Sequence, residues 1–152
     1  MTYDATQARQ ELLDSLAEVI DHLGDAVGAL GEAYELLDER NGDRLEDQLF
    51  RPVRSAYGRA QRTHTLFAEG HGLPVHRAAP PSAHAASHGV KGLVDLALEA
   101  VEQADGTLVA LQDSMRPVEV GDAELRAGLA EVRELIGDLR SRARGFVRTL
   151  GR

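Results

Sequence analysis

Histidines are the residues of this chain whose type and spacing could do chemistry. Five of the six lie between His64 and His88, and His84 and His88 are four residues apart, so a helix would carry both rings on one face. Neutral imidazoles in that arrangement bind zinc, copper, nickel or iron. The sequence therefore offers a candidate site for a divalent transition metal, made from His64, His71, His76, His84 and His88.

Four arginines form a second candidate site, because no acidic residue interrupts the chain between Asp47 and Glu69. Guanidinium groups bind phosphates and carboxylates, so an anion or an acidic partner could dock on Arg51, Arg54, Arg59 and Arg62. The alternative is pairing with acidic neighbouring helices. Binding of nucleic acid is not expected, since Tyr57 is the only aromatic residue between Arg51 and Arg62 and the net charge is −8.

Catalytic constellations are missing from the sequence. It contains no phosphate-binding glycine loop, no serine nucleophile elbow, and neither His-Glu-x-x-His nor Glu-x-x-His. The chain has no cysteine, which rules out disulfides and thiolate chemistry. We therefore expect a protein that is not an enzyme and needs no cofactor, with a metal at the histidines as the alternative.

Four amphipathic segments must position these residues. Apolar residues recur at alternating spacings of three and four, as in Leu13, Leu16, Ile20 and Leu23, which is typical of helices with one buried seam. The pattern predicts helices over about 5–40, 43–70, 87–116 and 122–150, with one long His/Pro-rich loop between the second and third.

Local signals place the ends of these helices. Asp4, Asp43, Ser87 and Asp122 are candidate N-caps, and Asn41-Gly42 is expected to end the first helix. Pro52 lies inside the second helix, where a missing N–H and a steric clash predict a kink or a break at Phe50.

These elements predict an all-α fold: one domain, 1–152, forming an antiparallel up-down-up-down four-helix bundle. The net charges of the ranges 1–40, 43–70, 87–116 and 122–152 are −8, +1, −3 and +2. In a ring where each helix touches its sequence neighbours, this alternation would set opposite signs side by side.

Two further features indicate a partner. Gly24, Gly28 and Gly31 form a stripe of small residues suited to close helix packing, either within the bundle or across a homodimer two-fold axis. Apolar residues outside the seams suggest an exposed strip; they are Leu12, Val19, Leu66, Leu96, Leu98, Val109, Leu135 and Val147. We therefore expect a cytoplasmic protein–protein interaction or scaffolding module, a homodimer without a membrane segment.

Overall fold

The structure is a computed structural model that describes residues 4–80 and 88–150. These two ranges form helices and contain no strand, which confirms the predicted all-α class. The elements are α1 (Ala5–Glu35), α2 (Glu39–Leu45), the π-helical turn η1 (Glu46–Phe50), α3 (Arg51–Gly70), α4 (Gly89–Asp113), α5 (Arg116–Glu119), α6 (Ala123–Ile136) and α7 (Leu139–Leu150). No helix within the described ranges is long and apolar enough to cross a membrane.

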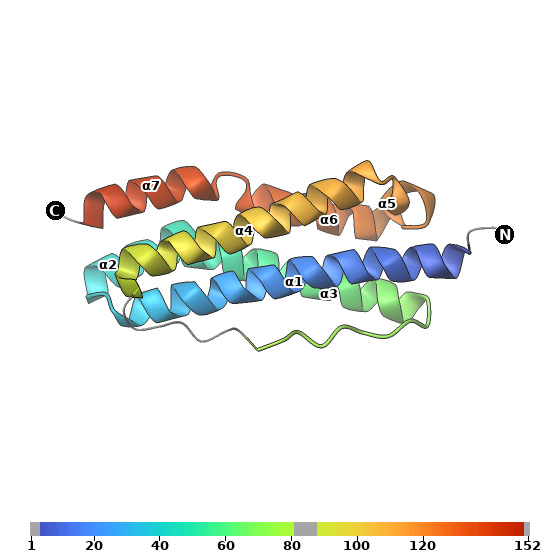
Figure 1. Cartoon of the computed structure of the whole chain (residues 1–152), viewed down its shortest axis with the longest axis horizontal. Coiled ribbons are helices and arrows are strands. Elements are labelled where there is room, and N and C mark those ends of the chain that lie inside the picture. Colours follow the sequence, from blue (N-terminus) through green and yellow to red (C-terminus); the bar gives the residue numbers. More distant parts are fainter. Residues whose placement is uncertain (1–3, 81–87, 151–152) are drawn as a thin grey trace.

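The long helices lie side by side along one axis (Figure 1). α1 packs against both α3 and α4, and its contact with α4 is the most extensive in the molecule. α6 packs against α3, and α7 packs against η1 and α4. Around the molecule the order is therefore α1, α3, α6 with α7, and α4.

The crossover that follows α3 begins with residues 71–80, which run back along the molecule, and α3 and α4 point in the same direction (Figure 1). The predicted up-down-up-down ring required them to be antiparallel and the first helix to touch the last. The structure corrects this order: α1 neighbours α4, and Glu11 of α1 lies 2.8 Å from Arg116, the first residue of α5 directly after α4. Such a crossover needs few residues, because an extended chain rises about 3.3 Å per residue against 1.5 Å in a helix.

The first turn lies five residues earlier than predicted. α1 ends at Glu35, and the side chain of Asp38 caps α2 by accepting a hydrogen bond from the N–H of Asn41 at 3.0 Å. Gly42 is buried inside α2, where a Cβ would lie 3.2 Å from the Tyr34 ring. The Asn41-Gly42 pair therefore lies in the next helix instead of ending the first.

Pro52 is accommodated without a break in the helical backbone. Directly before it, the chain widens into η1, and the N–H of Arg51 bonds to the carbonyl of Glu46, five residues back. A π-turn changes the hydrogen-bond pattern at the point where a proline ring would clash with the preceding turn. Helical backbone consequently continues from Glu39 to Gly70.

The end of the chain is also more divided than predicted. α4 stops at Asp113, and the separate α5 precedes α6. Asp122 caps α6 as expected, accepting a hydrogen bond from the N–H of Leu125 at 2.8 Å. The predicted last helix is interrupted at Gly137-Asp138, between α6 and α7. The expected cap at Ser87 lies outside the described residues.

Most of the apolar residues expected to form a surface strip belong to the interior. Leu12 and Val19 are fully buried, because α1 contacts a helix on each of two sides. Four more are partly buried and pack on the core; they are Leu96, Leu98, Leu135 and Val147. Val109 is half-buried and Leu66 is exposed. The predicted apolar strip is thus largely reduced to one residue on α3.

Candidate functional site

A histidine pair lies between α1, α3 and the crossover. We call residues 71–80, the described part of the crossover after α3, the strap. The ring of His76 in the strap lies over the ring of His64 in α3, with centroids 5.7 Å apart. His76 Nε2 is 3.0 Å from Asp21 Oδ1 of α1. Two of the five predicted metal-ligating histidines are therefore brought together.

His64 is a buried polar side chain in an apolar setting. It is 3% exposed, and its Nδ1 has no hydrogen-bond partner among the described residues. Burial lowers the pKa of the His64 imidazole and the nearby His76 lowers it further, while the Leu13 backbone and the Asp14 carboxylate oppose this shift. The balance favours a neutral His64.

Asp21 ties the strap to α1. Besides His76, its Oδ1 accepts a hydrogen bond from the N–H of Ala79 at 3.3 Å. Leu73 and Ala78 of the strap pack on the core. The pKa of Tyr57 is raised by burial and by the Asp21 charge, so this carboxylate acts on α3 as well.

The remaining histidines do not join this pair. His71 is exposed at the end of α3, with its ring 4.5 Å from that of Phe67. His88 immediately precedes α4, and His84 lies outside the described residues. Across residues 4–80 and 88–150, no group of three or more His, Asp or Glu could hold a metal ion. The described chain therefore does not assemble the predicted metal site.

Two of the four predicted anion-binding arginines are paired at the start of α3. Arg51 Nη1 lies 2.8 Å from Asp47 Oδ1, and Arg54 Nη2 lies 2.5 Å from Glu46 Oε1. The Arg54 guanidinium also stands 4.7 Å from the centroid of the Phe50 ring. Their partners precede them in the chain, so these arginines are engaged within their own helical segment.

The other two arginines differ from each other. Arg59 Nε lies 2.5 Å from Glu131 Oε2 of α6, and Arg59 Nη1 donates to Thr63 Oγ1 at 3.0 Å. Arg62 is exposed and makes no ion pair with any residue in the described ranges. Of the four, Arg62 is the one available to a partner.

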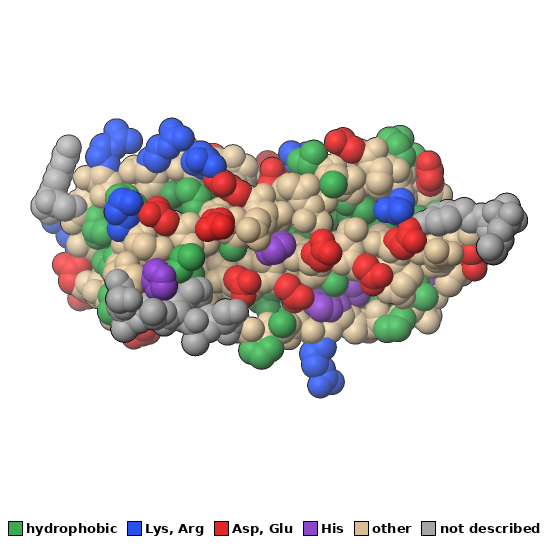
Figure 2. All heavy atoms as spheres, viewed as in Figure 1, with side chains coloured by type: hydrophobic (Ala, Val, Ile, Leu, Met, Phe, Trp, Pro, Cys, Tyr) green, Lys and Arg blue, Asp and Glu red, His purple; other side chains and the backbone are tan. Residues whose placement is uncertain are grey.

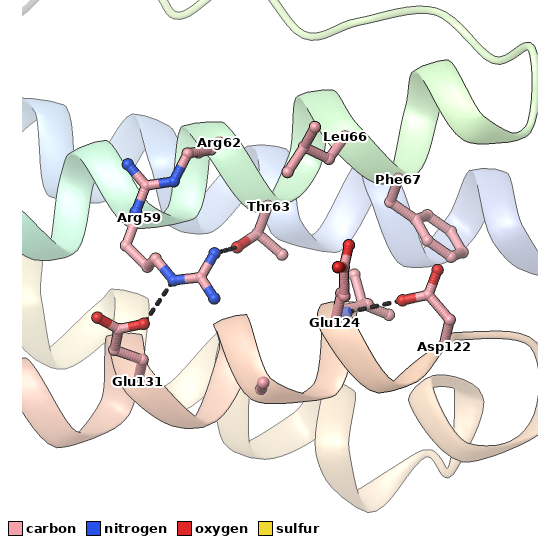
Figure 3. A pocket seen from close by; sticks show the side chains of 10 residues that line it. Arg59, Arg62, Thr63, Leu66, Phe67, Asp122, Glu124 and Glu131 are labelled. Atoms are coloured by element: carbon pink, nitrogen blue, oxygen red, sulfur yellow. Dashed lines mark hydrogen bonds and ion pairs between the residues drawn. The ribbon is translucent and has the colours of Figure 1, made fainter.

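Arg62 lines an open groove of about 410 Å³ between α3 and the first half of α6 (Figure 3). The Arg59–Glu131 pair crosses this groove. At Thr63, which also lines the groove, α3 and α6 approach closely: a Cβ on Gly128 would collide with the Thr63 hydroxyl. We call it the α3–α6 groove; its walls also include Leu66, Phe67, Asp122, Glu124, Leu125 and Ala127.

Leu66 is the unusual apolar residue of this groove. It is 54% exposed although it lies within a long helix. The other large apolar side chains exposed in the described ranges lie at helix ends, in turns, in the strap or in the four-residue α5; they are Tyr34, Leu36, Val75, Met115 and Val118. Exposed apolar residues beside a groove are typical of contact sites.

The glycine stripe of α1 is used inside the chain. A Cβ on Gly24 would lie 3.2 Å from Tyr57 Cε1, and one on Gly31 would lie 3.8 Å from Phe50 Cζ. Gly28 is half-buried. Two aromatic rings from the second helical segment therefore pack on this stripe, which accounts for Gly24 and Gly31 without a second chain.

Charge is separated between two sides of the molecule. α1 and α4 carry seven and five acidic residues, with Arg9 and Lys91 as their only basic ones. α3, α6 and α7 carry ten arginines and four glutamates. Figure 2 shows acidic side chains along the α1–α4 side and basic ones over α7. The alternation predicted from the sequence is therefore wrong, because the two acidic helices are neighbours.

Asp21 and Glu124 were not found as site residues from the sequence. Asp21 is 55 residues from His76, and no local pattern connects the two. In the sequence, Glu124 is an ordinary acidic residue in the first turn of a helix.

Comparisons of the chain with protein families, with curated proteins and with solved structures give no match.

Proposed function

We propose that this protein is a non-enzymatic four-helix-bundle interaction module that self-associates through the α3–α6 side. The observation that carries the proposal is Leu66, which is 54% exposed beside an open groove. Covering this exposed apolar side chain with a second surface removes it from water and so lowers the free energy.

The distribution of charge also favours contact through the α3–α6 side. A chain with net charge −8 repels a second copy most strongly where its acidic residues gather, on α1 and α4. The α3–α6 side holds the arginines of α3 and only a few acids. Contact through this side leaves the acidic sides of both copies facing solvent.

Sedimentation equilibrium of the full chain over a wide concentration series tests the proposal. We expect a reversible shift from the mass of one chain toward that of two. Leu66→Asp should weaken the association about ten- to hundred-fold, since burying a leucine contributes roughly 1.5–3 kcal/mol.

Leu36→Asp is the matched control. Leu36 is 58% exposed, but it lies in the turn between α1 and α2, away from the α3–α6 groove. It should leave the association constant unchanged. A wild-type chain that stays monomeric at every concentration would refute self-association, and equal loss in both variants would place the contact elsewhere.

A further inference from the structure

The two walls of the α3–α6 groove present opposite charges that are not paired with each other. Arg62 stands on α3 and Glu124 on α6, and neither makes an ion pair with another described residue. The remaining acids of the groove are engaged: Asp122 caps α6, and Glu131 pairs with Arg59. One cation and one anion are thus left for a partner.

Helix geometry places these two charges diagonally across the groove. Thr63 lies against Gly128, and the helices are antiparallel. With a rise of 1.5 Å per residue, Glu124 lies about 6 Å from that contact in the direction of Phe67, while Arg62 lies about 1.5 Å on the other side. The two charges are not paired with each other within the described chain, and a suitably rotated second copy brings each charge onto its opposite.

We propose that the α3–α6 groove is a two-fold interface in which Arg62 of each chain pairs with Glu124 of the other. The inference rests on the proposed function and names its contact. A two-fold axis that lies in the interface, perpendicular to the line from Arg62 to Glu124, exchanges the positions of these two residues. Isologous contacts are reciprocal, so one complementary pair produces two ion pairs.

Leu66 lies within the same contact. Along the groove its level falls between those of Arg62 and Glu124, the two points at which the chains pair. Leu66 is 54% exposed in the single chain, so a second copy that pairs at both points covers it.

Charge exchange is the test, with sedimentation equilibrium as the readout. Arg62→Glu and Glu124→Arg each turn two attractions into two repulsions, and each should weaken self-association about five- to thirty-fold. The double variant carrying both changes exchanges the charges and should recover association close to wild type. Because both residues are exposed, all variants should keep the wild-type circular dichroism spectrum.

Mixing the two single variants gives a second readout. Arg62→Glu chains should bind Glu124→Arg chains more tightly than either binds itself, since both cross-chain pairs are then attractive. Arg148→Glu, which reverses an exposed arginine on α7, is the control and should have no effect. If neither charge reversal changes the association constant, this interface is wrong while the proposed function still stands. A wild-type chain that stays monomeric would overturn both.

Discussion

The imidazole of His76 lies over the buried imidazole of His64, 5.7 Å between centroids, with its own Nε2 held by Asp21. A proton on His64 would therefore place a charge in an apolar interior beside a second imidazole. The opposing groups are Asp14 and the Leu13 backbone. This relationship makes the junction of α1, α3 and the strap sensitive to acid.

The free energy of unfolding should fall as the pH drops below about 6.5, the ordinary pKa of histidine. The pKa of folded His64 is lowered, mainly by burial and then by His76. The unfolded chain consequently binds the proton at a higher pH than the folded one. The stability contributed by neutral His64 is complete above pH 6.5 and is lost as the pH falls through the folded pKa. Urea unfolding at a series of pH values measures it.

His64→Leu isolates this effect from the other titrating groups. Leucine removes the Nδ1 atom that lacks a partner and cannot be protonated, so this variant should lose less stability between neutral and acidic pH than wild type. His71→Gln, at an exposed histidine, should keep the wild-type slope. Identical slopes for wild type and His64→Leu would assign the acid sensitivity to other residues.

Asp21→Asn should loosen the strap at neutral pH. The carboxylate accepts from both His76 and Ala79, and an amide is a weaker acceptor without charge. The pair is partly exposed, so the loss of global stability should stay below about 1 kcal/mol. A nitroxide at Val75→Cys reports strap mobility cleanly, because the chain has no other cysteine and Val75 is exposed.

The spectrum of the label should show faster motion in Asp21→Asn than in wild type. Glu18→Gln is the matched change, since Glu18 is an exposed acid of the same helix. Equal mobility in all three proteins would mean that the apolar contacts of Leu73 and Ala78 hold the strap on their own.

Helical periodicity was enough to predict the class and most of the core. Leu13, Leu16, Ile20 and Leu23 are buried as expected, because a seam of apolar residues is a local property of one helix. The caps at Asp4 and Asp122 were also readable, since a cap involves only neighbouring residues. Periodicity predicted one buried seam on α1, whereas the helix is buried on two sides.

Order around the molecule and the candidate sites could not be read from the sequence. The order of the helices depends on the direction in which the strap leaves α3, and the sequence of a loop does not determine that direction. Asp21 meets His76, and Thr63 meets Gly128, only through tertiary packing. Arg59 and Arg62 have the same residue type and lie three positions apart, yet one is engaged and the other is available. Such differences are set by which helix lies opposite.

The close approach of α3 and α6 is itself testable through Gly128. A methyl group there would collide with the Thr63 hydroxyl and lie 2.8 Å from its Cγ2, and Thr63 is buried. Gly128→Ala should therefore destabilise the chain by about 1–3 kcal/mol despite the better helix propensity of alanine, as overpacking usually does. Urea unfolding at neutral pH measures the change.

Gly106→Ala provides the opposite expectation at a comparable glycine. Gly106 is exposed within α4, and a Cβ there meets no atom within 4 Å. Alanine should then stabilise the chain by up to about 1 kcal/mol through helix propensity alone. A stabilising Gly128→Ala would mean that Thr63 can turn away and that the two helices are not in tight contact. Because Thr63 also lines the α3–α6 groove, Gly128→Ala should shift that lining and weaken self-association as well.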